Sequence, residues 1–260
     1  MPSDLSEALL ASIPDGKVLD VRIGLSWTAV VVEIAGARRC GLAATLRGER
    51  GHGSPTMPDA GHLVERSARE LAIWASPDTG NLTQTSVGFA TLNALLAAAA
   101  ADQQWTDLNA AEVIAERGVG KRVALVGHFP FVEQLREQVG ALWVLELQPQ
   151  PGDLPASAAA EILPQADIIA VTATTLINGT FAGLMALANP VALTMLLGPS
   201  TPLSPVLFDH GVDILSGALV QDIDATLRAV SQGAGFRQIH RAGVRLVSRW
   251  AETGKSAGAR

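Results

Sequence analysis

Polar side chains that can transfer protons follow two apolar runs in the second half of the chain. His128 comes directly after KRVALVG (121–127), and Glu146 ends the apolar run that starts at Leu142. An imidazole titrates near neutral pH and a carboxylate can accept a proton, so this pair suits acid and base catalysis. A histidine that satisfies a loop carbonyl and a solvated strand end would explain the same residues equally well. His128 and Glu146 are therefore candidate catalytic residues for a reaction that the sequence does not name.

Loop residues with hydroxyls, amides and no side chain form a second set of candidates. They follow the apolar runs that end at Gly127, Val171 and Leu197, and Asn178 to Thr180 are expected to cap the next helix. Hydroxyls and loop N–H groups suit a ligand site, although ordinary turns are built from the same residues. The candidate ligand-binding residues are Phe129, Thr172, Thr174, Asn178, Gly179, Thr180, Gly198, Pro199, Ser200 and Thr201.

Soft metal ligands are scarce in this sequence. A single cysteine, Cys40, excludes an internal disulfide and multi-cysteine zinc sites, and the histidines show no HxH or HExxH spacing. A metal would have to be held by distant residues such as His128, Glu146 and Cys40. The loop after the first apolar run is GHFPF rather than GxGxxG, which disfavours a nicotinamide cofactor. The cofactor is left open, with a divalent metal or a metal chelate as the candidates.

The segments that position these candidates alternate between strand and helix patterns from residue 121 onward. Such alternation predicts a parallel sheet with helices on both faces, in which connections are right-handed. The carboxyl ends of parallel strands meet at one edge, so the candidate loops are expected to share a crevice. The expected strands are 121–127, 142–147, 166–171, 191–197 and 212–215, and the expected helices are 131–139, 153–163, 181–188 and 223–232.

The first half has a different order, with strands first and helices afterward. β-Branched runs predict strands at 18–25, 27–34 and 40–45, and helical spacing follows in 60–74 and from Asn81. This order is typical of an α+β unit, and the small residues of 40–45 indicate that another backbone comes close. We expect two domains, 1–106 and 107–260. The expected fold class is α/β, with a smaller α+β domain before a sheet with helices on both faces.

Composition limits the partners. The 260 residues carry a net charge of −6, which argues against nucleic acid. Two long uncharged runs contain Thr, Ser, Gly and Asn, so we expect buried elements of a soluble fold and no membrane span. The first residues lack the pattern of a signal peptide. A single cysteine, which excludes an internal disulfide, favours the cytoplasm. The alanine-rich segment 94–101 is a candidate surface for a homodimer.

Several stretches resemble the bacterial and archaeal family known as "putative heavy-metal chelation". They are VALVGHFPF (123–131), Glu146 with PGD (151–153), ADIIAVTATTLINGT (166–180), LLGPSTPLSP (196–205), GVDILSGALVQD (211–222) and, in the first half, CGLAAT (40–45) and SVGFATLNAL (86–95). The resemblance implies a domain similar to the enolase amino-terminal fold joined to a Rossmann-like domain. It also implies a site in the cleft between them for a metal, a metal chelate or a pterin-like molecule.

Three functions stay open at this point. The first is a cytoplasmic protein that binds a small anionic or metal-chelating molecule between its domains, with Glu146 accepting hydrogen bonds and the loops at 178–180 and 198–201 donating them. The second is a lyase or transferase type of enzyme in which His128 and Glu146 act as acid and base. The third is a pure metal-binding module, which the scarcity of soft ligands disfavours.

Overall fold

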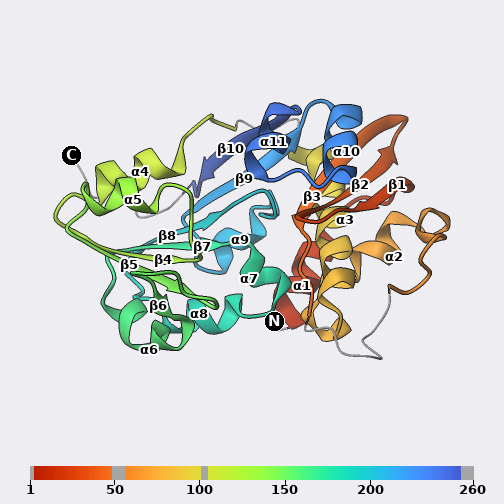
Figure 1. The fold of residues 1–260 in the computed structure, drawn as a ribbon. Helices are drawn as coiled ribbons and strands as arrows, with labels where there is room; N and C mark the ends of the chain where they lie inside the picture. The colour runs from red at the N-terminus through yellow and green to blue at the C-terminus, as the bar shows by residue number, and fades with distance from the viewer. Residues whose placement is uncertain (1–2, 49–56, 101–104, 253–260) are drawn as a thin grey trace.

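A computed structural model describes residues 3–48, 57–100 and 105–252 and contains two sheets (Figure 1). The smaller sheet is antiparallel in the order β1-β2-β3. Its strands are β1 (Lys17–Ile23), β2 (Trp27–Ile34) and β3 (Ala37–Ala44), and the helical elements of this half are α1 (Ser3–Ala11), η1 (Leu63–Glu65), α2 (Ala68–Ala72), η2 (Pro77–Thr79) and α3 (Leu82–Ala100). The three predicted strands are confirmed, whereas the helix predicted over 60–74 is only two short pieces.

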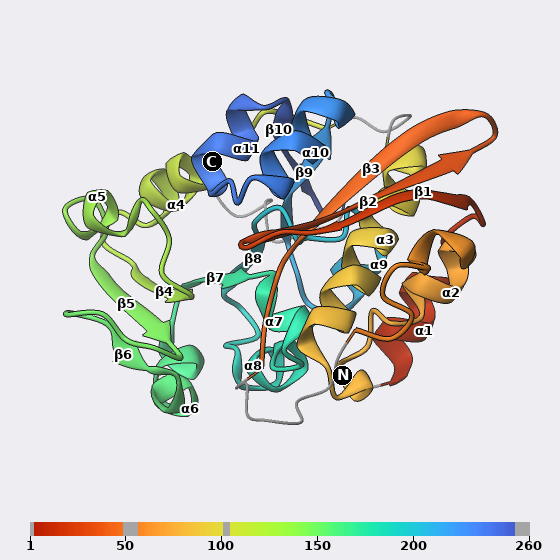
Figure 2. The same cartoon turned by 45° about the vertical axis from the view of Figure 1, so that its right-hand side comes forward.

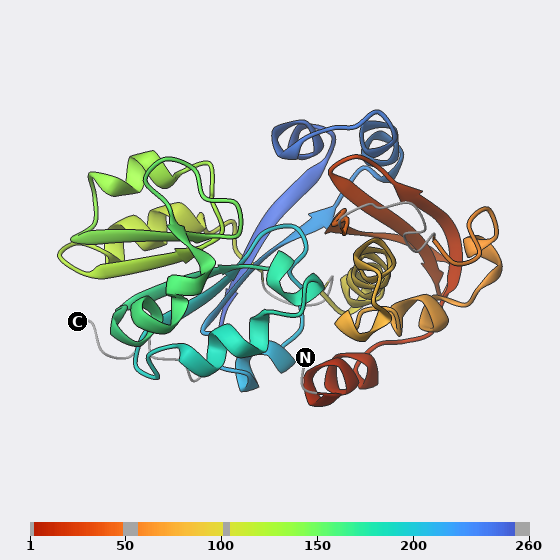
Figure 3. The same ribbon diagram turned by 60° about the horizontal axis from the view of Figure 1, so that its bottom comes forward.

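The small sheet is covered on both faces, which explains why β2 is an almost unbroken apolar run. Successive side chains of a strand point to opposite faces. Val30 and Val32 pack in the core that contains α3, whereas Ala29 and Val31 pack against residues of α10 (Ile223–Ser231). Figures 2 and 3 show the sheet between these two helices. A helix from the second half of the sequence therefore completes the core of the first half.

Glycine in β3 allows the close approach that the small residues predicted. A Cβ atom on Gly41 would lie 2.2 Å from the Ala90 carbonyl oxygen and 2.2 Å from the Ala94 nitrogen, both in the backbone of α3. Neither atom can move without shifting the helix. The predicted backbone contact is confirmed, and its partner is α3.

The larger sheet has seven strands in the order β10-β9-β8-β7-β4-β5-β6. All neighbouring pairs are parallel except β9 with β10. Without β10, the order matches the 3-2-1-4-5-6 order of doubly wound folds. The strands are β4 (Arg122–Val126), β5 (Ala141–Glu146), β6 (Leu154–Pro155), β7 (Ile168–Thr172), β8 (Leu193–Leu197), β9 (Ile214–Val220) and β10 (Val244–Trp250).

Helices cover both faces of this sheet, as predicted (Figure 1). Val123 and Leu125 of β4 pack with α4 and α5, whereas Ala124 and Val126 face the opposite core with α6, α7 and α8. The helical elements are α4 (Ala110–Arg117), α5 (Val132–Arg136), η3 (Ala156–Ala158), α6 (Ala159–Ile162), η4 (Leu163–Gln165), α7 (Thr174–Ile177), α8 (Phe181–Leu187), α9 (Val206–Asp209), α10 and α11 (Phe236–Arg241). The predicted order of an α+β part followed by an α/β part is confirmed.

Several elements differ from the sequence prediction. The segment 172–175, expected as a turn, enters the short helix α7, and 153–163 begins with β6 instead of a helix. The helix α11 and the antiparallel edge strand β10 were not predicted. Local periodicity gives no signal for an edge strand that pairs in the opposite direction, because the pairing is decided by distant contacts.

The two halves share one apolar core. Leu5 of α1 and Phe89 of α3 belong to the same buried cluster as Leu176 and Leu207. Polar contacts add to it at the end of β3, where the Ala44 N–H donates to Ser200 Oγ at 2.8 Å. The domain boundary after residue 106 stays a prediction.

The alanine-rich segment lies mostly inside the monomer. Ala94, Leu95, Leu96 and Ala100 are buried, and Ala101 lies outside the described residues. This segment therefore lacks the exposed apolar face on which the homodimer prediction depended, and a homodimer stays a prediction. In the described part of the chain, no helix combines the length and apolar character needed to cross a bilayer.

Candidate functional site

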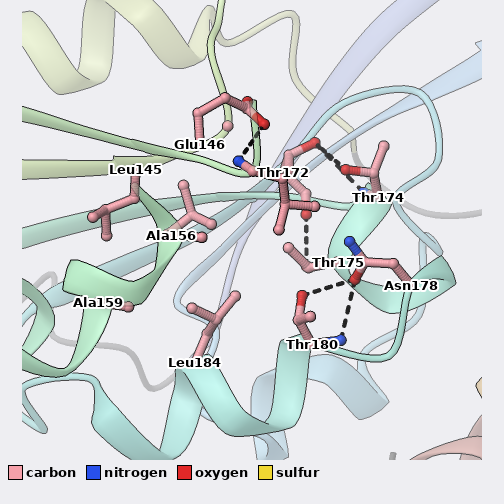
Figure 4. Close-up of a pocket in the computed structure, with 13 residues that line it drawn as sticks. Leu145, Glu146, Ala156, Ala159, Thr172, Thr174, Thr175, Asn178, Thr180 and Leu184 are labelled. Atoms are coloured by element: carbon pink, nitrogen blue, oxygen red, sulfur yellow. Dashed lines mark hydrogen bonds between the residues drawn. The ribbon is translucent and has the colours of Figure 1, made fainter. Parts of the chain in front are cut away.

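A pocket of about 170 Å³ opens at the carboxyl ends of β4, β5 and β7 (Figure 4). The chain leaves β4 toward β5 on one side of the sheet and later returns to β7 on the other, so this edge is the switch point where doubly wound folds bind ligands. The pocket is lined by Val126, Gly127, Leu145, Glu146, Leu147, Ala156, Ala159, Thr172, Thr174, Thr175, Asn178, Thr180 and Leu184. All of these residues belong to the second half, and no described residue of the first half lines the pocket.

The lining of the pocket is divided into an apolar and a polar side. Figure 4 shows Leu145, Ala156, Ala159 and Leu184 toward one side, with the hydroxyls and the Asn178 amide opposite them. Glu146 is the one charged side chain among the lining residues. Such a division suits a molecule with one apolar surface and several polar atoms.

The Glu146 carboxylate is fixed at the end of β5 by two backbone amides. The His128 N–H donates to Oε2 at 2.9 Å, and the Leu147 N–H donates to Oε1 at 2.7 Å. A carboxylate oxygen has two acceptor positions, so each oxygen keeps one for a ligand. Glu146 is therefore an oriented hydrogen-bond acceptor on the pocket wall.

Glycine is required at the end of β4 for this arrangement. Gly127 has a φ of +103°, a region that favours glycine, and a Cβ there would lie 2.9 Å from the Thr172 methyl carbon. Its N–H donates to the Leu145 carbonyl at 2.8 Å. The loop can thus turn sharply and bring the His128 amide to Glu146.

The threonines after β7 supply hydroxyls. Thr172 Oγ1 lies 3.1 Å from Thr174 Oγ1, and the Thr175 O–H donates to the Thr172 carbonyl at 2.7 Å. Thr172 and Thr174, two of the predicted ligand-binding residues, are half-buried and line the pocket. Their hydroxyls can both donate and accept hydrogen bonds, so they can bind either a donor or an acceptor group of a ligand.

The turn at Asn178 to Thr180 differs from the predicted helix cap. Asn178 Oδ1 accepts hydrogen bonds from the Thr180 N–H at 3.1 Å and the Thr180 O–H at 2.7 Å, and no side chain caps α8. Gly179 has a φ of +78° and lies outside the pocket lining. The cap prediction was wrong because the side-chain carbonyl oxygen of Asn178 accepts its hydrogen bonds from Thr180, within the turn. Its amide nitrogen donates no hydrogen bond within the described residues and remains available on the pocket wall.

His128 and Asp153 form a pair beside the pocket. His128 Nδ1 lies 2.9 Å from Asp153 Oδ2, and the Asp153 side chain is fully buried while that of His128 is 25% exposed. Burial alone would raise the pKa of the Asp153 carboxyl. Hydrogen bonds from His128 and the Gln150 N–H, with the nearby charges of His128 and Arg136, outweigh burial and hold the pKa below its usual value.

The pairing has a chemical consequence for His128. An ionised carboxylate at Nδ1 favours a proton on that nitrogen, so Nε2 is left to accept a proton or bind a ligand. Asp153 was expected to frame the loop after the second strand together with Glu146, but it was not among the predicted site residues. Its position two loops away gave no local signal of this contact.

Two further predicted regions lie away from the pocket. Phe129 stacks on Phe131 with ring centroids 5.2 Å apart. Gly198 and Pro199 do not line the pocket, and Ser200 and Thr201 are each 2% exposed. The Thr201 O–H donates to the Ser216 carbonyl at 2.9 Å. The expectation that 198–201 share the crevice with 172–180 is therefore not met, because this loop turns toward β3 and α3.

The described residues contain no group of three or more His, Cys, Asp or Glu side chains that could hold a metal ion. Cys40 is buried in the small sheet, where burial raises the pKa of its thiol to about 12. A thiol in this state is a poor metal ligand, since metals bind the thiolate. The side chains of the described residues do not fit direct chelation of a heavy metal.

Comparisons with known protein families give matches for both halves of the chain. Residues 109–248 and 6–96 each match a family model described as "putative heavy-metal chelation". An uncharacterized protein of Methanocaldococcus jannaschii is 28% identical over 225 residues, which are 82% of each chain.

Two crystal structures of proteins with unknown function are similar to the whole chain. The one from Desulfitobacterium hafniense has a TM-score of 0.81 and 27% identity, and covers 95% of this chain and 98% of its own. The one from Pyrococcus horikoshii has a TM-score of 0.79 and 24% identity with the same coverage, and it supports the fold alone.

Proposed function

The chain belongs to the family described as "putative heavy-metal chelation", and from this premise we propose that it binds a small polar molecule at the switch-point pocket. Any metal would be held by that molecule and not by protein side chains. The observation that carries the proposal is the Glu146 carboxylate, held by two backbone amides with one acceptor position free on each oxygen.

Charge limits which part of the molecule enters the pocket. Among the lining residues that the structure describes, Glu146 is the one that carries a charge, and none is basic. An anionic group would be repelled there, so the bound part presents hydroxyl or amino donors to Glu146. The anionic ligand expected from the sequence would have to keep its charge outside the pocket.

Absence of a metal-ligand cluster in the described residues supports the chelate form of the proposal over a bare ion. Chelating molecules supply nitrogen and oxygen ligands themselves. The protein then needs to recognise only the organic part, through Thr172, Thr174, Asn178 and the apolar wall. A pocket with hydroxyls on one side and aliphatic side chains on the other fits that task.

The test is analysis of the protein as purified, by native mass spectrometry together with elemental analysis. We expect an organic molecule near one equivalent, any metal in proportion to it, and loss of both in Glu146→Gln. Thr174→Val removes a hydroxyl from the polar side of the pocket. Glu116→Gln is the control, because it makes the same chemical change as Glu146→Gln on the exposed surface of α4. Stoichiometric metal without an organic molecule, retained in Glu146→Gln, would contradict the proposal.

A second candidate function rests on the His128 and Asp153 pair. A buried carboxylate that orients an imidazole through Nδ1 is the arrangement by which enzymes prepare a general base. In this version His128 transfers the proton, and Glu146 holds the substrate instead of acting as the second acid. The bound molecule would be converted by the wild type. His128→Gln would bind it without conversion, whereas equal conversion by both proteins would exclude the enzyme.

A further inference from the structure

We infer that the molecule bound at the switch-point pocket is nucleoside-like, with a planar heteroaromatic ring, a vicinal cis-diol and no diphosphate. The inference rests on the proposed function and adds the chemical class of the ligand. Three features of the pocket carry it: the free acceptor positions of Glu146, the apolar wall opposite the hydroxyls, and the hydrogen bonding of the first loop.

The diol follows from Glu146. Its two oxygens each accept one backbone N–H and each retain one acceptor position, so two neighbouring hydroxyls can donate one hydrogen bond to each oxygen. Glu146 ends β5, the second strand of the doubly wound order. An acidic residue at that place binds ribose hydroxyls in folds of this kind.

The planar ring is inferred from the chemistry of the walls and the small volume of the pocket. Leu145, Ala156 and Leu184 present aliphatic surface on one side, and the Thr174 hydroxyl and Asn178 amide face them in Figure 4. The pocket volume of about 170 Å³ is below the roughly 300–1,000 Å³ of pockets for drug-sized ligands, so it suits a compact group. A heteroaromatic ring offers flat apolar faces and polar edges, and neighbouring ring nitrogen and oxygen atoms also chelate metals.

The absence of a diphosphate follows from the loop after β4. Dinucleotide folds hold the pyrophosphate with free amides of a glycine-rich loop and the start of the next helix. Here the Gly127 N–H donates to Leu145, the His128 N–H donates to Glu146, and Pro130 has no N–H. The next helix, α5, has five residues, and none of the described residues that line the pocket is basic. The loop that would hold a diphosphate is instead used to fix the acceptor for the diol.

The experiment is isothermal titration of the full chain with the four ribonucleosides, followed by the 2′-deoxy and 5′-diphosphate forms of the best binder. We expect saturable 1:1 binding of at least one ribonucleoside. Because hydrogen bonds to a charged group are the stronger kind, the deoxy form should bind about 10- to 100-fold more weakly. The diphosphate form should bind no more tightly than the nucleoside.

Variants and a second diol sharpen the test. In Glu146→Gln the preference for the ribonucleoside over its deoxy form should fall below about threefold, whereas Glu116→Gln should keep it. Titration with catechol distinguishes binding of an aromatic diol from binding of a ribose. The deoxy comparison in the wild type needs no variant, so it decides the matter even where Glu146→Gln does not fold.

The inference and the proposed function can fail separately. Tighter binding of the diphosphate, equal binding of the deoxy form, or binding of catechol without any ribonucleoside would each overturn the nucleoside class. The proposed function would survive these results wherever a co-purified molecule still depends on Glu146. A chain that retains no molecule and binds no probe would overturn both.

Discussion

Replacing Ser200 with alanine separates a structural from a ligand-binding role for the loop at 198–201. The Ser200 side chain is 2% exposed, and its Oγ accepts the Ala44 N–H at 2.8 Å across the contact between the halves. The Ser200 carbonyl, which accepts the Asn93 side-chain amide at 3.2 Å, is untouched by the substitution. Ser200→Ala therefore removes one hydrogen bond and leaves the Ala44 N–H without its acceptor.

Leaving a fully buried donor without an acceptor costs about 1–3 kcal/mol, and this bond is only partly buried, so the free energy of unfolding should fall by about 1 kcal/mol. For a chain of this size the loss corresponds to a decrease in Tm of about 2–4 °C. Urea unfolding followed by tryptophan fluorescence measures the loss, and Ser26→Ala, in the exposed turn between β1 and β2, is the control with an expected change within about 0.5 kcal/mol. The affinity for the pocket ligand should stay at the wild-type value. Unchanged stability together with lost ligand binding would refute the structural role and restore the sequence prediction for Ser200.

Three further predictions concern the core, the site and the cysteine. Gly41→Ala should lower the free energy of unfolding by more than about 3 kcal/mol, because its Cβ would overlap the backbone of α3. Gly183→Ala in α8 should raise it by up to about 1 kcal/mol, because nothing lies within 4 Å of the added Cβ. Urea unfolding of both variants measures the difference. The pKa of Asp153 is lower in the folded than in the unfolded state, so its contribution to stability is complete above an unfolded pKa of about 3.9 and is lost as the pH falls through the folded value. Unfolding free energies between pH 2 and 7 should therefore fall less steeply with acid in Asp153→Asn than in the wild type, and parallel profiles would contradict the pairing with His128. Cys40, with a thiol pKa of about 12, should react with a disulfide reagent at pH 8 only after unfolding in urea, and fast reaction of the native protein would contradict its burial.

Residues at strand ends were predictable because their position depends on neighbours in the sequence. Glu146 ends an apolar run and Thr172 follows one, so both were placed at the correct edge of the sheet before any tertiary information. Gly41 lies in a stretch of small residues that indicated a close backbone. The helix at 153–163 was mistaken because 3-10 turns and a two-residue strand give the same short-range pattern as a helix.

The contacts that decide the candidate site were beyond the sequence. Asp153 meets His128 across 25 positions, and Ser200 meets Ala44 across 156. Both pairs depend on how whole elements pack. Residues 198–201 and 172–180 are both polar loops that follow apolar strands. Only the packing of β3 and α3 against 198–201 shows that this loop has a structural role, whereas residues of 172–180 line the pocket.

The sequence by itself determined that an α+β part precedes a part of alternating strands and helices. It also determined the acidic overall charge, the single cysteine and the polar composition of the strand-end loops, because periodicity and residue type are local properties. The tertiary structure alone decided that β10 pairs at the sheet edge in the opposite direction, that α10 covers the small sheet, and that the described residues lining the pocket all come from the second half. Each of these results from burial of apolar faces between elements far apart in the chain. Such burial is a property of the packed molecule, and no single segment carries it.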